Sequence, residues 1–154
     1  MSYLPKNISL IVIGKGIEGP NLQKQAFSLG VSDRVKFLGF IPYAEIPNYF
    51  SVCDIFVRPS RSEGFGNSFI EAMASRLPVI ATPVGGISDF IDDKETGLFC
   101  SPDNPQSIVR SVNMILNDAS LREKIIKQAY DRVALRYSWD HVAEEMKVVF
   151  EKLT

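Results

Sequence analysis

The chain has 154 residues and a formal net charge of −1, with 45% hydrophobic and 23% charged residues. This is the balance of one soluble globular domain, without the overall positive charge that would point to nucleic acid. No apolar run in the sequence reaches the ~20 residues that span a bilayer. The N-terminus lacks signal-peptide organisation, and Cys53 and Cys100 have no nearby set of metal ligands. We therefore expect a cytoplasmic protein whose cysteines are reduced and behave as small buried apolar residues.

The first part of the chain alternates short apolar runs with longer mixed ones. Residues 8–13 and 35–38 are rich in apolar and β-branched side chains, which predicts two buried strands. A helix is expected from Pro20 to Leu29, because proline favours a helix start and Gly30 a helix end. A second, short helix is predicted over residues 43–52.

The second part of the chain continues the alternation. Strands are predicted at residues 54–57, 79–81 and 98–100, and helices at 70–74, 105–116, 120–136 and 139–153. Asn67 or Ser68 is expected to cap the first of these helices and Ser138 the last, where Trp139 is expected to pack against the sheet. The alternation indicates an α/β fold with a Rossmann-like, doubly wound parallel sheet. We expect a single domain over residues 1–154, with C-terminal helices from about residue 105.

Ligands of such sheets bind beyond the carboxyl ends of the strands. The segments that follow the predicted strands should therefore share one rim: Gly14, Phe40, residues 60–66 and residues 83–86.

Gly14, Gly16 and Gly19 match the Gly-x-Gly-x-x-Gly pattern of dinucleotide-binding proteins. An NAD site also needs a carboxylate at the end of the next strand to hold the ribose, and here that strand ends Phe37-Leu38-Gly39. We therefore favour a glycine turn beside another ligand. Lys15, Arg58 and Arg61 are cations near the same rim, for which ordinary solvation is the simplest interpretation.

The segment Glu63-Gly64-Phe65-Gly66-Asn67-Ser68-Phe69-Ile70-Glu71 is the most informative one. Its two glycines allow a sharp turn and a close approach to a ligand. A helix that starts after them would present free N–H groups and the positive end of its dipole to an anion. Amides for phosphate and carboxylates for hydroxyl groups suit a sugar that carries phosphate.

This segment strongly resembles the Glu-x7-Glu signature of retaining nucleotide-sugar glycosyltransferases of the GT-B fold, specifically the GT4 family (group 1). Further segments resemble the family in the same order, so that the resemblance runs from about Ile8 to Leu153; they are residues 34–42, 54–60, 77–82, 84–87, 95–99 and 137–140. The resemblance implies the C-terminal, donor-binding half of such an enzyme, acting in polysaccharide or glycoconjugate biosynthesis.

The resemblance also implies a role for each residue of the segment. Glu63 would face the donor sugar as the catalytic residue, with a covalent nucleophile role disfavoured, and Glu71 would accept hydrogen bonds from the ribose. The residues between them would offer backbone amides. The donor-binding set implied is Gly14, Gly16, Phe40, Ile41, Ser60, Glu63, Gly64, Phe65, Gly66, Asn67, Ser68, Phe69 and Glu71. No cofactor and no obligatory metal is expected, because the chain has no Asp-x-Asp pair.

Two parts of the family's pattern have no counterpart in this sequence. The family's donor domain begins with a strand and loop that carry an arginine and a lysine, and this first βα unit is apparently absent. Partial replacement of that pair by Lys15, Arg58 or Arg61 is the alternative to their ordinary solvation. The acceptor-binding N-terminal half is also missing, so we expect a chain that is incomplete as an isolated enzyme. Its expected partners are a nucleotide-sugar donor and an N-terminal half or a second copy, with membrane association only through that missing half. The alternative is a non-catalytic nucleotide-sugar-binding or assembly module.

Overall fold

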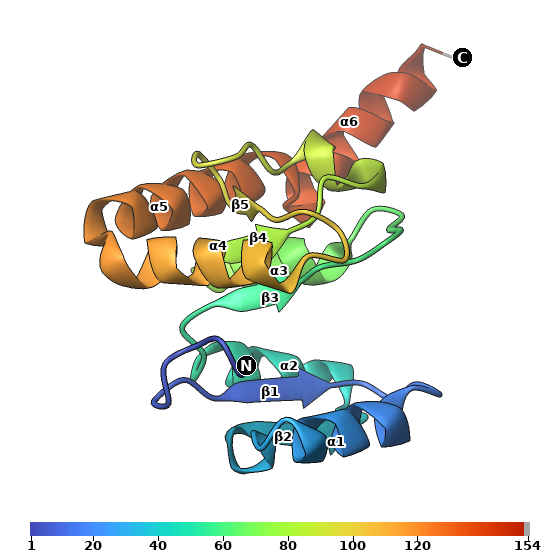
Figure 1. The fold of residues 1–154 in the computed structure, drawn as a ribbon. Helices are drawn as coiled ribbons and strands as arrows, with labels where there is room; N and C mark the ends of the chain where they lie inside the picture. The colour runs from blue at the N-terminus through green and yellow to red at the C-terminus, as the bar shows by residue number, and fades with distance from the viewer. Residues whose placement is uncertain (153–154) are drawn as a thin grey trace. The chain divides into compact units, whose positions relative to one another are not determined.

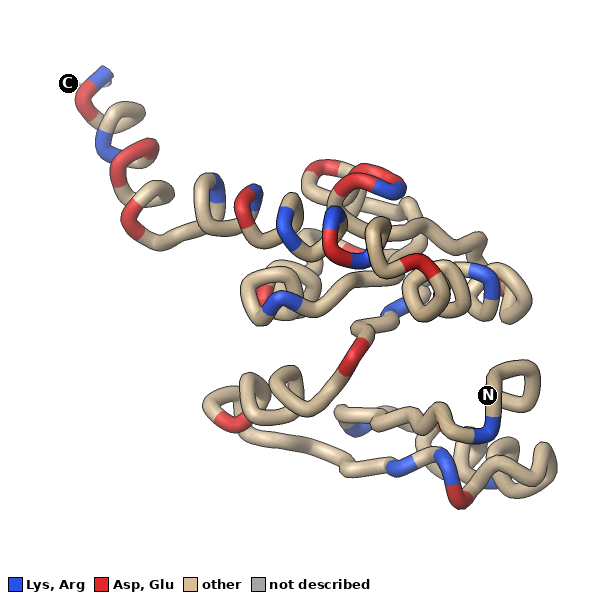
Figure 2. Tube along the Cα trace, turned by 90° about the vertical axis from the view of Figure 1, so that its left-hand side faces the viewer, with Lys and Arg blue, Asp and Glu red and all other residues tan. Residues whose placement is uncertain are grey.

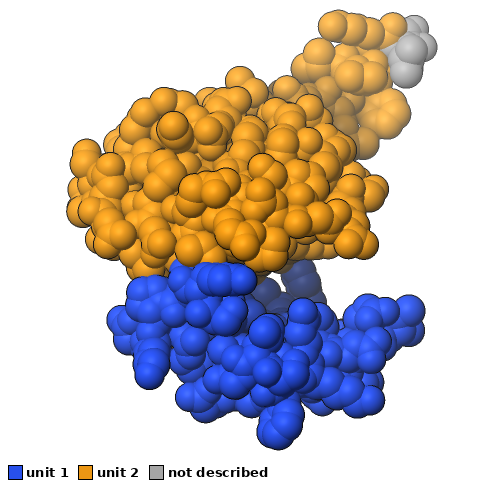
Figure 3. Space-filling model, in the orientation of Figure 1, with its two compact units in different colours: residues 1–48 blue, residues 49–154 orange. Residues whose placement is uncertain are grey.

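The computed structural model describes residues 1–152, and the chain divides into two compact units, Met1–Asn48 and Tyr49–Thr154 (Figure 3). Each unit has its own parallel sheet. The single domain expected from the sequence stays a prediction, and each unit is described by itself below.

The first unit is a β-α-β arrangement (Figure 1). Strand β1 (Leu10–Ile13) pairs in parallel with β2 (Val35–Gly39), and helix α1 (Gly19–Ser28) connects them through the 3₁₀ turn η1 (Ser32–Arg34). Proline in its first turn starts α1, and Gly30 ends it in the left-handed conformation at a φ of 64°. Both predicted strands and the predicted helix are confirmed.

Arg34 ties the N-terminal segment to the first unit. Its guanidinium donates to the carbonyl oxygens of Pro5 at 2.8 Å, Ile8 at 3.2 Å and Met1 at 3.1 Å.

The predicted helix at residues 43–52 is a 3₁₀ turn, η2 (Tyr43–Glu45), followed by the five-residue α2 (Ile46–Phe50).

The second unit holds a three-stranded parallel sheet in the order β3-β4-β5. The strands are β3 (Phe56–Arg58), β4 (Val79–Ala81) and β5 (Leu98–Phe99). β3 begins two residues later than predicted, and its first ladder bond runs from the Phe56 N–H to the Pro78 oxygen at 3.0 Å. Pro78 has no N–H to donate, which explains why pairing does not extend further back.

Helices cover this sheet. The helices α3 (Asn67–Ala74) and α4 (Pro105–Asn117) both contact β4, and α5 (Ala119–Arg136) packs against α3 and α4. Asn104 and Asp118 cap α4 and α5 through their side-chain oxygens. The core consists of fully buried apolar side chains, among them Phe69 and Met73 of α3, Ile80 of β4, Phe90 after β4, Ile115 of α4 and Ile125 of α5.

The last helix, α6 (Trp139–Glu151), extends away from the rest of the second unit (Figure 1). The Ser138 Oγ caps it by accepting from the His141 N–H at 3.3 Å, as predicted. The expected packing of Trp139 against the sheet is wrong, because the helix leaves the unit at this point and Trp139 is 87% exposed. Residue 153 of the predicted helix lies outside the described residues.

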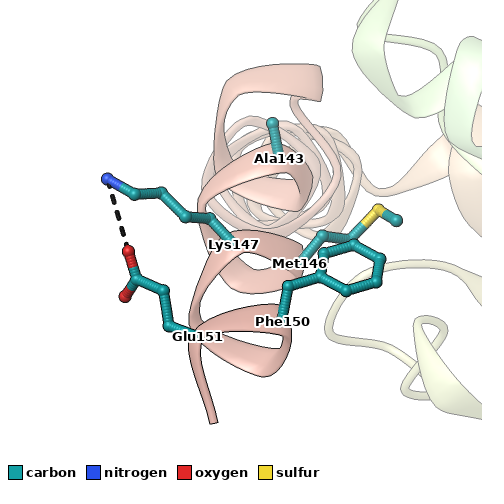
Figure 4. Close-up of a pocket in the computed structure, with 5 residues that line it drawn as sticks. All are labelled: Ala143, Met146, Lys147, Phe150 and Glu151. Atoms are coloured by element: carbon teal, nitrogen blue, oxygen red, sulfur yellow. Dashed lines mark ion pairs between the residues drawn. The ribbon is translucent and has the colours of Figure 1, made fainter. Parts of the chain in front are cut away.

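A hollow of about 530 Å³ on α6 is lined by Ala143, Met146, Lys147, Phe150 and Glu151 (Figure 4). All five residues belong to one helix, and the hollow has no opposing wall. We therefore do not assign a ligand to it.

Charged residues of both signs are spread along α5 and α6 (Figure 2). Within residues 1–152, no helix combines the length and the apolar character needed to cross a membrane.

Cys53 and Cys100 are free thiols. Burial raises the pKa of each thiol, and the Asp54 charge adds to the effect at Cys53. The raised pKa favours the protonated thiol over the reactive thiolate in both residues.

Candidate functional site

The loops that follow β3, β4 and β5 lie at one edge of the second unit's sheet. The register places Arg58 opposite Ala81 and Ala81 opposite Phe99, so the three parallel strands end together. The loop after β3 contains the Glu63 segment, and the loop after β4 contains the glycine pair Gly85-Gly86. This edge is where doubly wound sheets bind ligands.

The two loops are in direct backbone contact. The Gly86 N–H donates to the backbone oxygen of Gly64 at 2.9 Å. The hydroxyl of buried Thr82 donates to the backbone oxygen of Ser60. A Cβ at Gly85 would lie 1.8 Å from the backbone oxygen of Glu63, and the φ of Gly85 is 56°. Only glycine fits here, because any Cβ would collide with the backbone of the loop that carries Glu63.

Helix α3 begins directly after this loop. Its N-cap is Gly66, with a φ of 84° and no side-chain cap bond, so the predicted cap by Asn67 or Ser68 is wrong. A Cβ at Gly66 would lie 2.9 Å from Ile87 Cδ1 in the left-handed backbone, which explains why glycine takes the position. Asn67 and Ser68 instead form the first turn, where N–H groups have no preceding helical carbonyl.

Glu63 is held inside the loop by two neighbours. Its Oε2 pairs with Arg58 Nη2 at 2.8 Å and accepts from the Ser60 hydroxyl at 3.4 Å. The side chain is only 13% exposed. Arg58 also donates through Nη1 to the Ser68 Oγ at 2.8 Å, so it connects Glu63 to the first turn of α3. The sequence suggested an ordinarily solvated cation at Arg58, whereas the structure gives this side chain two polar partners.

The remaining residues of the segment divide between site and core. Glu71 lies half-buried in the second turn of α3, where it interacts with a neighbouring group. The Phe65 ring lies tilted against the rings of Phe90 and Tyr137, at centroid distances of 5.7 and 5.6 Å. Phe69 is fully buried, and its N–H donates to the Gly66 oxygen at 2.9 Å. The expected role of the Phe69 amide in donor binding is therefore not available in this conformation.

The neighbouring cation, Arg61, points to a different partner. It pairs with Asp103, in the loop after β5, at 2.8 Å. Both side chains are largely in water, at 81% and 64% exposure, so this pair contributes little to stability.

Four predicted site residues, Gly14, Gly16, Phe40 and Ile41, belong to the first unit. There the Gly14 N–H donates to the Gly39 oxygen at 2.7 Å, which joins the ends of β1 and β2. These four residues thus share an edge of their own sheet. Their part in one site with Glu63 stays a prediction.

The sequence reasoning missed the structural roles of Arg58 and of Gly85 and Gly86. The available signals were a charged residue that ends an apolar strand and a glycine pair directly after the next strand. Within the described part of the chain, no three carboxylate, histidine or cysteine side chains gather as a metal site would require. The expectation that no divalent ion is needed stays untested.

Comparison with known proteins identifies the family. Residues 2–132 match the family described as Glycosyl transferases group 1. The chain belongs to this family. It is 35% identical over 145 residues to a glycosyltransferase of Methanocaldococcus jannaschii, in a match that covers 94% of this chain and 37% of that relative. The chain thus spans little more than a third of the length of this relative.

Solved structures of the family share the fold. HepE of Anabaena, solved with UDP, is 25% identical with a TM-score of 0.91, over 98% of this chain and 43% of that chain. The same protein has been solved with UDP-glucose. The C-terminal domain of a group 1 glycosyltransferase, LpcC of Francisella tularensis, is 34% identical with a TM-score of 0.76, over 85% of this chain and 70% of that chain. The predicted Rossmann-like fold of a GT-B C-terminal half is confirmed.

Proposed function

We propose that this chain is the donor-binding part of a retaining glycosyltransferase and binds a nucleotide-diphosphate sugar between the Glu63 loop and the start of α3. The observation that carries the proposal is the largely buried Glu63 carboxylate, held at the carboxyl edge of a parallel sheet next to a helix start. A carboxylate recognises sugar hydroxyls, and the N–H groups of a helix start recognise phosphate.

The proposed chemistry divides between these two features. Glu63 would orient the sugar on the face where transfer occurs with retention at the anomeric carbon. The departing nucleotide diphosphate gains negative charge, and the first turn of α3 would stabilise that charge through its N–H groups and dipole. Glu71, in the next turn, would hold the ribose hydroxyls.

A thermal-shift panel of nucleoside diphosphates and their sugars tests the proposal. A ligand at about ten times its Kd adds about 1.4 kcal/mol to the stability of the state that binds it. We expect one nucleoside diphosphate and its sugar to raise the melting temperature and matched nucleoside monophosphates to do so less. A panel with no shift at saturating concentrations would contradict the proposal.

The two glutamates should respond differently to removal. Loss of a charge-assisted hydrogen bond costs ~1.5–3 kcal/mol, or about one to two decades of affinity. We expect Glu71→Ala to weaken binding of the free nucleoside diphosphate, and Glu63→Ala to weaken mainly the discrimination among sugars. Titration calorimetry measures both effects. Equal losses for the free nucleoside diphosphate in the two variants would contradict the assigned roles.

The second candidate is a module that binds the donor without turnover of its own. The chain spans 37% of the length of the Methanocaldococcus relative, so turnover by the whole protein stays a proposal beside this one. Transfer needs donor and acceptor held together in reacting geometry. Incubation of the chain with a labelled nucleotide sugar and acceptors, with and without an added acceptor-binding half, separates the two candidates.

A further inference from the structure

We propose that Arg58 is a positioning residue: it acts through Glu63 and Ser68 to hold the loop and the first turn of α3 in the conformation that receives the donor. This inference rests on the proposed function and deepens it. It concerns a residue outside the donor-binding set that the sequence predicts.

The position of Arg58 in the sheet makes it a fixed anchor. It is the last residue of β3, and the ladder with β4 places it opposite Ala81. The loop residues between Arg58 and α3 are in no strand or helix. A side chain that reaches from the strand end to Glu63 in that loop and to Ser68 in the first turn of α3 therefore fixes both points relative to the sheet.

The contacts use the two terminal nitrogens separately. Nη2 pairs with Glu63 and Nη1 donates to Ser68, each at 2.8 Å. A planar guanidinium presents donors in a rigid fork, whereas the ammonium of a lysine is a point charge on a flexible chain. Lysine at this position can retain one contact more readily than both.

Burial distinguishes this pair from an ordinary surface ion pair. Arg58 is 46% exposed, so its own attraction to a carboxylate is screened by water. Glu63, however, is 13% exposed. A charged group that is largely removed from water needs its partners, and without Arg58 only the longer Ser60 contact is described for it. We expect Glu63 to turn toward water when Arg58 is removed.

The geometry also assigns an oxygen to the ligand. Both described contacts of Glu63 use Oε2. Oε1 is then the oxygen placed to accept a hydrogen bond from a sugar hydroxyl. Arg58 would thus affect binding of the sugar more than binding of the nucleotide.

The test compares Arg58→Met and Arg58→Lys with a matched control, Arg61→Met. The control removes the same charge from the loop that follows β3 but breaks only the exposed pair with Asp103. Amide hydrogen exchange is measured without ligand at Phe69 and Gly86, whose N–H groups donate to the backbone oxygens of Gly66 and Gly64. Titration calorimetry is carried out with UDP-glucose and with UDP, or with the nucleotide pair that the thermal-shift panel identifies.

We expect Arg58→Met to speed exchange of the Phe69 and Gly86 amides roughly tenfold, because the loop and the first turn of α3 that hold their acceptors are released. It should weaken UDP-glucose binding roughly fivefold, the upper end for a pair with one partner in solvent, and UDP binding less. Arg58→Lys should recover part of both effects, and Arg61→Met should resemble the wild type. Unchanged exchange in Arg58→Met, or faster exchange with an unchanged ratio of the two affinities, overturns the proposal.

A double variant separates positioning from direct contact with the donor. If Arg58 acts through Glu63, adding Arg58→Met to Glu63→Gln should cause little further loss of sugar discrimination, because the two changes remove the same interaction. Additive losses would mean that Arg58 itself touches the donor and would overturn the positioning role. If the wild type binds no nucleotide or nucleotide sugar, the proposed function fails, and the donor role of Arg58 fails with it, whatever the exchange shows.

Discussion

Replacing Gly85 by alanine is expected to displace the Glu63 loop and to lower the free energy of unfolding of the second unit by about 2–5 kcal/mol. The added Cβ would lie 1.8 Å from the Glu63 oxygen and 3.0 Å from the Glu63 carbonyl carbon. Both are backbone atoms, which cannot turn aside as a side chain does. The φ of 56° adds the cost of a left-handed conformation for a residue with a Cβ.

Urea denaturation measures the loss of stability, and calorimetry with the donor measures the loss of binding. Gly64→Ala is the matched stability control, because a Cβ there meets nothing within 4 Å and its φ is not in the left-handed region. Wild-type stability and donor affinity in Gly85→Ala would show that the two loops are not packed as described.

Phe69→Ala is expected to cost about 3–5 kcal/mol in the free energy of unfolding. The ring is fully buried and packs edge-on against Phe56 of β3, with a centroid distance of 5.3 Å and an interplanar angle of 89°. It also lies 6.2 Å from the Phe90 ring. Removing it leaves a cavity between α3, β3 and the turn that follows β4.

Phe150→Ala is the control for this prediction, because Phe150 lies on α6 and is largely exposed. An exposed substitution of this kind typically changes stability by less than about 0.5 kcal/mol. Denaturant titration of both variants provides the comparison. Similar midpoints for Phe69→Ala and the wild type would show that the Phe69 ring is not part of the core.

The strands and helices could be predicted from the sequence because their signals are local. Apolar β-branched runs predicted β1 and β2, Pro105 predicted the start of α4, and Ser138 predicted the start of α6. The family signature around Glu63 was also readable, because glycines and glutamates at this spacing form a recognisable pattern.

The remaining features depend on contacts between segments that are distant in the sequence. Gly66, rather than a side-chain cap, starts α3, because the loop packs against Ile87. Ser68 looked like a cap but accepts a hydrogen bond from Arg58, ten residues earlier. Trp139 has a large aromatic side chain typical of a core, but α6 extends away from the second unit from its first residue, and Trp139 is exposed. Helical periodicity does not report any of these contacts.

The small number of buried apolar side chains in the first unit affects the heat that its unfolding absorbs. Among its described apolar side chains, Ala26 and Val31 are buried, while Leu10 and Ile13 at the two ends of β1 are more than a third exposed. Little apolar surface is removed from water there, so its heat-capacity change and unfolding enthalpy are small. The first unit by itself should therefore contribute only a small part of the calorimetric enthalpy of unfolding. A donor that binds at Glu63 would stabilise the second unit directly.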